Sequence, residues 1–354
     1  MKITNTLNKI FPIGCMFIFT ILFIIKPEIC KGGVSSAIIL CTQVVIPALF
    51  PFTVCVLFIM KTGVLEKLKF LQPLSNWLFG LPSQLFAVML LSFVGGYPIG
   101  AKLINDLIRE KKISASDGRR MLNFCVNAGP AFIIAAVGSG ILNSKTLGYI
   151  LLVSHVGSSL TICILSRFSK SKIKIFDSLP SKTISAADNF VASAAEGAKV
   201  ILNICSFVIF FAGITAYIDF YSSRLPAIKP LLFLTEVTSA VAKTKNVYLI
   251  SFLLGFAGIS IWCQIMTVGK AIKINFLSFI LFRIIHGLLS LGFTAVLVKM
   301  FNVSLPAFSN TNNLKTLTFS SGMHLSLSLL VMGIVFIISL SDNKRDRKIL
   351  EDFI

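Results

Sequence analysis

The sequence contains little charge. Only 13% of its 354 residues are Asp, Glu, Lys or Arg, whereas about a quarter of a soluble protein is charged. Residues of the set AVILMFWYC make up 55%, and the mean hydropathy is +0.88. Too few polar side chains remain to cover the surface of a water-soluble globular protein. We therefore expect an all-α polytopic membrane protein.

Acidic residues are especially scarce, since 14 Asp and Glu stand against 33 Lys and Arg, a formal net charge of +19. In a soluble protein this excess would suggest nucleic-acid binding, but no stretch is polar enough to form a domain with a basic patch. We expect no nucleic-acid partner. Lys and Arg are enriched in the short cytoplasmic loops of membrane proteins, and such loops account for the surplus.

Motifs for metals, cofactors and hydrolysis are missing. The eight cysteines are scattered singly without a CxxC pair, so neither a zinc site nor a disulfide framework is indicated. No HExxH, Gx-Ser-x-Gly or paired-carboxylate motif occurs. The run 138–146 ends in Lys-Thr but has Ser139 and Ser144 where a phosphate-binding loop needs glycine. We expect no enzyme, no metal and no cofactor.

Long apolar runs define the organisation, because a helix of about 20 apolar residues crosses the hydrocarbon core. No cleavage site follows the first run, so we interpret it as a retained helix and not as a signal peptide. A shorter apolar stretch covers 225–242. The sequence predicts eight or nine spans, within 10–25, 34–59, 85–104, 121–142, 147–168, 193–220, 247–268, 274–300 and 318–340.

Basic residues are concentrated in 102–120, in 167–182 and in the tail, which we place in the cytoplasm. The resulting division has five parts. These are an N-terminal helix (1–33), a first membrane repeat (34–168), a basic cytoplasmic loop (169–192), a second membrane repeat (193–340) and a basic cytoplasmic tail (341–354).

The run Gly95-Gly96-Tyr97-Pro98 interrupts the third predicted span. Glycine costs about 1 kcal/mol and proline about 3 kcal/mol inside a helix, so we expect a break here. Broken helices at membrane depth are tolerated only beside protein or a water-filled cavity, which indicates a binding site. A kink or a close helix contact is the alternative. Counting lysines on each side of this segment favours a re-entrant hairpin over a full crossing.

Further interruptions follow. The next span is broken near Gly129-Pro130, with the amides of Asn123 and Asn127 close by, and a third Gly-rich segment begins at Gly255, 160 residues after Gly95. A span followed by an interrupted span in each half is typical of secondary transporters, whose site lies at the repeat interface. The charge distribution places the starts of the two halves on opposite sides, which predicts inverted repeats.

Ionisable residues at membrane depth are costly and often functional. Arg283 and His286 are three residues apart and share one helix face. This pair could hold an anionic group, with the arginine making a bidentate contact. Gln264, just after the last Gly-rich break, could hydrogen-bond a ligand.

Other polar residues in or near the apolar runs could have a structural or a functional role. We expect His155, which is isolated in an apolar run, to be a packing residue. Glu196 and Glu236 lie near helix beginnings and could serve as caps, salt links or sites of ion coupling. Lys102 could be a cytoplasmic anchor or a substrate contact.

The run 95–102, followed by a charged amphipathic piece and then by 127–134, resembles the sporulation integral membrane proteins of the YlbJ type. These belong to the wider nucleoside-recognition (Gate) domain group. Glu236-Val237-Thr238 and the segments 255–260 and 283–287 resemble the same family, so the likeness covers 34–340.

The resemblance implies a spore-formation protein related in architecture to concentrative nucleoside transporters, with two re-entrant hairpins. It further implies movement of dipicolinate, an aromatic dicarboxylate, from the mother cell across the outer forespore membrane. The expected partners are this small anion or a nucleoside, the lipid bilayer and further copies of the chain in a homo-oligomer. The identity of the substrate and the assignment to the outer forespore membrane rest on the resemblance alone.

We expect the substrate site where the breaks at Gly95 and Gly255 meet the helices of Asn127 and Arg283. One alternative is a nucleoside or nucleobase carrier that relies on neutral amides. Another is a non-transporting protein of spore envelope assembly, in which the breaks serve packing. The candidate substrate-binding residues are Gly95, Gly96, Tyr97, Pro98, Asn123, Asn127, Gly129, Gly255, Gly258, Ser260, Gln264, Arg283 and His286.

Overall fold

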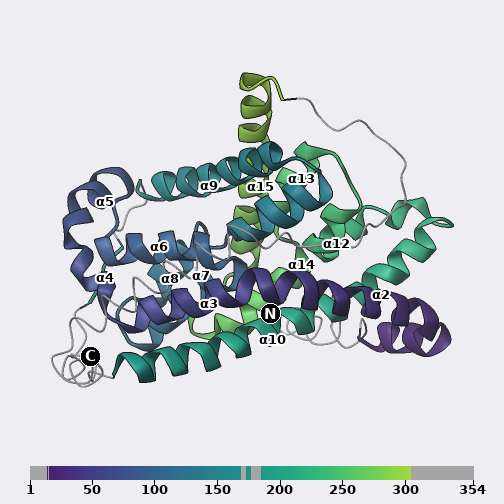
Figure 1. The fold of residues 1–354 in the computed structure, drawn as a ribbon, viewed down its shortest axis with the longest axis horizontal. Helices are drawn as coiled ribbons and strands as arrows, with labels where there is room; N and C mark the ends of the chain where they lie inside the picture. The colour runs from purple at the N-terminus through teal and green to yellow at the C-terminus, as the bar shows by residue number, and fades with distance from the viewer. Residues whose placement is uncertain (1–13, 15, 169–172, 177–184, 304–354) are drawn as a thin grey trace, which may run out of the picture.

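Every regular element in the described part of the chain is a helix (Figure 1). The structure is a computed structural model that describes residues 14, 16–168, 173–176 and 185–303. The all-α fold class predicted from composition is confirmed for these residues. The start of the first predicted span, most of the basic loop between the halves, the span predicted at 318–340 and the tail lie outside the described residues.

Five helices in the described residues are long and apolar enough to cross a membrane, or six if a bent pair counts as one span. Eight or nine were predicted. The predicted spans 85–104 and 121–142 are divided into shorter helices, because both contain the glycine and proline interruptions noted above. The five spans are Pro27–Lys61, Lys145–Ser166, Ala186–Ser222, Val247–Val268 and Phe276–Met300.

The first half begins with one continuous apolar rod, made by α2, η1 and α3, in which η1 is a π-helix. Its elements are α2 (Pro27–Leu40), η1 (Cys41–Val45), α3 (Ile46–Lys61), α4 (Val64–Lys67), η2 (Leu68–Leu71), α5 (Gln72–Phe79), α6 (Ser83–Gly95), α7 (Tyr97–Arg109), α8 (Ala115–Leu122), η3 (Phe132–Ile141) and α9 (Lys145–Ser166).

The second half begins with the long helix α10, whose N-cap Ser185 accepts a hydrogen bond of 3.1 Å from the backbone N–H of Asp188. Its elements are α10 (Ala186–Ser222), η4 (Pro226–Ile228), α11 (Leu231–Thr235), α12 (Val237–Ala242), α13 (Val247–Phe256), α14 (Gly258–Val268), η5 (Lys270–Ile272) and α15 (Phe276–Met300).

Helices α6 and α7 pack against each other as a hairpin that turns at Gly96. Gly96 has φ +84° and ψ −178°, a conformation that is essentially restricted to glycine. A Cβ on Gly100 of α7 would lie only 2.9 Å from the Cβ of Ser92 on α6, so this glycine permits the close approach of the two helices. The turn lies where the sequence predicted it.

The two open ends of this hairpin lie near the same basic segment. A Cβ on Gly80, just before α6, would be 3.0 Å from the side chain of Arg167. After α7, the carbonyl of Lys112 accepts a 2.8 Å hydrogen bond from the N–H of Phe176. Both ends therefore belong to the side on which the sequence places the basic loops.

The break between α13 and α14 is of a different kind. Ala257 and Gly258 both have φ of 72°, yet α13 and α14 together still form one 22-residue span. The second hairpin lies earlier in the chain, where α11 and α12 pack together around Glu236. The 160-residue offset thus relates a hairpin turn at Gly95 to an interrupted span at Gly255, and these two breaks are not alike.

Each half contains, in order, a long helix, a hairpin, an interrupted helix and another long helix, but α4, η2 and α5 precede the hairpin only in the first half. The long helices pair across the halves, α3 with α10 and α9 with α15 (Figure 1). Each hairpin contacts the interrupted helix of the other half, α7 with α14 and α12 with η3. The interrupted segments therefore meet in the middle of the protein. The inverted relation of the halves stays a prediction.

Candidate functional site

A small cavity of about 40 Å³ lies where the interrupted segments meet. Both halves contribute to its walls, from η1, α3, α7 and η3 on one side and α10, α12 and α14 on the other. It is lined by Val44, Val45, Ala48, Leu49, Gly96, Tyr97, Pro98, Gly129, Phe132, Ile204, Val208, Val237, Thr238, Ile261 and Gln264. The structure thus brings together five of the predicted residues, namely Gly96, Tyr97, Pro98, Gly129 and Gln264.

Two glycines bring the hairpin turn against the neighbouring interrupted span. A Cβ on Gly96 would lie 3.5 Å from the backbone nitrogen of Gly129, and one on Gly129 would lie 3.6 Å from the Cα of Gly96. Tyr97, beside this contact, donates a 2.6 Å hydrogen bond from its hydroxyl to the carbonyl of Leu254 in the second half. The first break is therefore fixed against both halves at the cavity.

Glu236 forms the corresponding feature of the second hairpin. Its buried carboxylate accepts hydrogen bonds from the N–H groups of Thr238 at 2.9 Å and Ser239 at 2.5 Å. This is the N-cap of α12, the first of the roles left open by the sequence. The cap aligns Val237 and Thr238 with the cavity wall.

The cavity wall is mostly aliphatic, and its principal polar side chain is Gln264. This residue is fully buried, its Nε2 lies 3.5 Å from the hydroxyl of Ser260, and its Oε1 has no hydrogen-bond partner within the described residues. A buried polar atom without a partner costs about 1–3 kcal/mol. The amide oxygen is thus positioned to accept a hydrogen bond from a ligand or a water molecule.

Arg283 and His286 do not line this cavity. Arg283 is fully buried, and its Nη1 donates a 2.7 Å hydrogen bond to the carbonyl of Val126 while Nη2 donates to that of Asn123. These carbonyls belong to the end of α8 and the unwound segment after it, where the helical ladder is interrupted. Arg283 therefore satisfies backbone groups that would otherwise be unpaired at membrane depth.

Two stacked histidines support the same segment from another side. The rings of His155 and His286 have centroids 4.5 Å apart. His286 Nδ1 lies 3.3 Å from Arg283 Nη1, and its Nε2 lies 3.1 Å from the carbonyl of His155. His155 Nε2 accepts a 2.9 Å hydrogen bond from the N–H of Ala128. His155 thus contributes to packing and to backbone pairing, in agreement with the sequence.

The other predicted residues are not among those that line the cavity. Asn127 is buried, donates a 2.9 Å hydrogen bond to Phe124 O, and has no partner for Oδ1 among the described residues. Gly255 is a packing position, since a Cβ there would be 2.6 Å from the Cα of Gly287. Gly95, Asn123, Gly258 and Ser260 belong to the same interrupted segments. Direct substrate contact by any of these residues stays a prediction.

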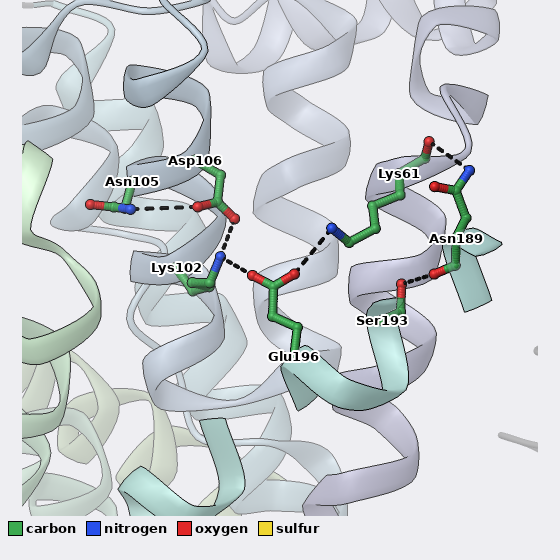
Figure 2. A network of polar contacts seen from close by, with 7 residues as sticks. All are labelled: Lys61, Lys102, Asn105, Asp106, Asn189, Ser193 and Glu196. Carbon is green, nitrogen blue, oxygen red and sulfur yellow. Dashed lines mark hydrogen bonds and ion pairs between the residues drawn. The ribbon is translucent and has the colours of Figure 1, made fainter. Parts of the chain in front are cut away.

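An ion-pair network joins α10 to α3 and α7 (Figure 2). The carboxylate of Glu196 pairs with Lys61 Nζ at 3.1 Å and also with Lys102, which pairs in turn with Asp106. Asn189 extends the network to the carbonyl of Lys61 at 3.5 Å. Glu196 is thus a salt link between the halves, and Lys102 is held by two carboxylates.

Sequence reasoning missed most of the cavity wall, because its aliphatic residues look like any others in an apolar span. Val44 and Val45 belong to the π-helix η1, and Phe132 begins the π-helix η3. Such segments often occur at functional sites, but no pattern in the sequence marks them. The one available signal was Glu236, a charged residue that interrupts the apolar stretch 225–242 and directly precedes Val237 of the cavity wall.

The helical spans, with a buried cavity between interrupted helices, define a polytopic integral membrane protein. The chain is similar to the sporulation integral membrane protein YlbJ of Bacillus subtilis (strain 168), with 21% identity in an alignment that covers 81% of this chain and 82% of that protein. The resemblance inferred from the motifs is confirmed by this relative, whereas the Gate domain assignment stays a prediction. No protein-family profile matches the chain, and no solved structure matches it significantly.

Proposed function

We propose that the protein is a sporulation membrane transporter that moves a small aromatic anion, dipicolinate, across the outer forespore membrane. The observation that carries the proposal is the cavity between the two halves, where the turn at Gly96, the unwound segment at Gly129 and the buried amide of Gln264 converge. Interrupted helices that meet at a repeat interface are the usual location of a transporter site.

The described conformation is closed. A cavity of about 40 Å³ has room for a few water molecules at most, so a pyridine dicarboxylate enters only after the walls separate. The Gly96 hairpin turn borders Leu49 of α3 and Gly129, and its movement away from α12 and α14 would enlarge the space. Binding would then stabilise a more open state relative to the described one.

Charge complementarity in this account comes from backbone groups. The N-terminus of α7 borders the cavity through its N-cap Gly96, and helix N-termini carry partial positive charge. Arg283 acts behind the unwound segment as a positioning residue. Its positive charge favours an anion in the space nearby, whereas the carboxylate of Glu236 at the start of α12 opposes one.

A nucleoside or nucleobase is the second candidate substrate. No charged side chain is among the described residues that line the cavity, and Gln264 offers a neutral amide. An amide can pair with the edge of a base through one donor and one acceptor. A nucleoside carrier would therefore depend on Gln264 and would bind uridine in preference to an aromatic dicarboxylate.

The experiment is the dipicolinate content of spores that lack the protein, complemented with wild type, Gln264→Leu or Gln43→Leu. Gln43 is exposed on η1 and serves as the matched control. We expect low dipicolinate without the protein and with Gln264→Leu, and normal content with wild type and Gln43→Leu. Normal dipicolinate in spores that lack the protein would reject the proposed substrate.

A further inference from the structure

A second and larger cavity, of about 350 Å³, shares no described lining residue with the first. It is formed between the end of α5, the end of α8, the end of α9 and the segment 173–176. The residues that line it are Asn76, Phe79, Gly80, Leu81, Arg120, Ser166, Arg167 and Ile173.

Two arginines are the charged side chains among the described residues that line this cavity. Arg120 donates a 2.9 Å hydrogen bond through Nη2 to the carbonyl of Ser166, and Arg167 donates through Nη1 to the carbonyl of Trp77. These bonds fix both guanidinium groups at helix ends. No acidic residue is among the described residues that line the cavity. Planar guanidinium groups in fixed orientations are suited to phosphate, which they bind through paired N–H donors.

The neighbouring helix has the features of a membrane interface. The segment Leu68–Phe79 is bent by 80° from α6, so it runs across the direction of the hairpin. It exposes Phe70 at 73% and Trp77 at 70%, and Phe168 beyond α9 is 79% exposed. Aromatic side chains are enriched at the level of lipid headgroups, and amphipathic helices lie in that plane. The two arginines are therefore at headgroup depth, on the side that the sequence assigns to the cytoplasm.

We propose that this cavity binds a phosphate group and that the bilayer supplies it as the headgroup of an anionic phospholipid. Basic pockets between membrane helices on the cytoplasmic side bind such headgroups. A headgroup held by Arg120 and Arg167 connects the segment before α6 to the end of α9. It thereby braces the open end of the α6–α7 hairpin, whose other end borders the first cavity.

The test is native mass spectrometry of the full-length protein, released from bilayers that contain equal amounts of phosphatidylglycerol and phosphatidylcholine. The variants are Arg120→Gln, Arg167→Gln and the double variant. Arg119→Gln is the matched control, because it removes the same charge from the same turn of α8 and does not line the cavity. Thermal melting of each variant identifies any that fail to fold, and Arg120→Lys with Arg167→Lys gives a second pair in which the charge is kept.

We expect wild type and Arg119→Gln to retain one phosphatidylglycerol in preference to phosphatidylcholine. The preference falls about fivefold for each single Gln variant and about thirtyfold for the double variant. The Lys pair gives an intermediate value. Equal retention of phosphatidylglycerol by the wild type and the double variant would overturn the site.

Inorganic phosphate provides the second arm of the test. We expect millimolar phosphate to leave the retained phosphatidylglycerol in place. A second possible result is that inorganic phosphate raises the melting temperature of wild type, but not of the double variant, while no lipid preference is found. This result would overturn the proposal that the bound phosphate belongs to a lipid. If neither ligand binds, the arginines act only as caps for the ends of α5 and α9, and the proposal fails.

Discussion

Arg283 in α15 donates a 2.7 Å hydrogen bond to the carbonyl of Val126, 157 residues earlier in the chain. This bond joins the last described helix of the second half to the unwound segment of the first half. Backbone pairing therefore accounts for both terminal nitrogens of this buried guanidinium, whereas its Nε has no hydrogen-bond partner among the described residues. The pairing also fixes the segment that carries Gly129 to the cavity wall.

We predict that Arg283→Ala abolishes accumulation of the small anion while the protein still inserts into the membrane. The carbonyls of Asn123 and Val126 lose their donor, so stability also falls, by about 3 kcal/mol. Thermal melting of the purified protein measures this loss. Exposed Arg109 provides the control, and Arg109→Ala should melt like wild type. An Arg283→Ala variant with wild-type melting and no transport would instead indicate direct contact with the substrate.

Gly96→Ala tests whether the break serves transport. An L-residue at φ +84° and ψ −178° is strained by about 1–3 kcal/mol, so the turn should shift and spore dipicolinate should fall. Gly63 has φ +69° in the left-handed helical region, with open space around it and away from the cavity, so Gly63→Ala introduces a smaller backbone strain without touching the site. We expect normal dipicolinate for this control. A protein that serves only envelope assembly would tolerate both substitutions equally.

Gly255→Ala and Gly292→Ala should have opposite effects on stability. A Cβ at position 255 would clash with the backbone of Gly287, where α13 and α15 are in close contact, whereas nothing lies within 4 Å of a Cβ at 292. We expect the first variant to be destabilised by about 1–3 kcal/mol and the second to be stabilised by up to about 1 kcal/mol. Melting temperatures of the two variants decide the matter. Similar shifts would argue against the close contact between these helices.

The ion-pair network predicts coupling between Glu196 and Lys102. Glu196→Gln and Lys102→Met should each lower the melting temperature, and the double variant should lose less than the sum of the two, because both singles break the same pair. High salt should reduce the difference, since these side chains are partly exposed. For comparison, the more exposed pair of Lys243 and Asp219 should show little coupling. Additive losses for Glu196 and Lys102 would show that the pair contributes nothing measurable.

Much of the fold could be predicted from the sequence, because a helix that crosses a bilayer must be apolar over its whole length. The predicted span 147–168 corresponds to Lys145–Ser166, and the predicted span 247–268 has the same bounds in the structure. The turn at Gly96 was also predicted, because Gly-Gly-Tyr-Pro is a poor helix sequence whatever surrounds it.

The site was less accessible to sequence reasoning. Arg283 was correctly identified as an unusual charge, but its partners are backbone carbonyls of a distant segment, and carbonyls leave no signature in a sequence. Ile204 and Val208 line the cavity only because α10 packs against the rod of α2 and α3. The match of Gly95 with Gly255 relied on spacing, which cannot distinguish a hairpin turn from an interruption within one span.

The decisive measurement for dipicolinate transport is uptake by the purified protein in liposomes. Labelled dipicolinate is supplied outside the vesicles, and unlabelled dipicolinate or uridine is added as a competitor. A dipicolinate transporter should show saturable uptake that excess dipicolinate blocks, that uridine leaves unchanged and that Gln264→Leu abolishes. Uptake no greater than in protein-free liposomes, or uptake that uridine blocks as well as dipicolinate does, would contradict this function.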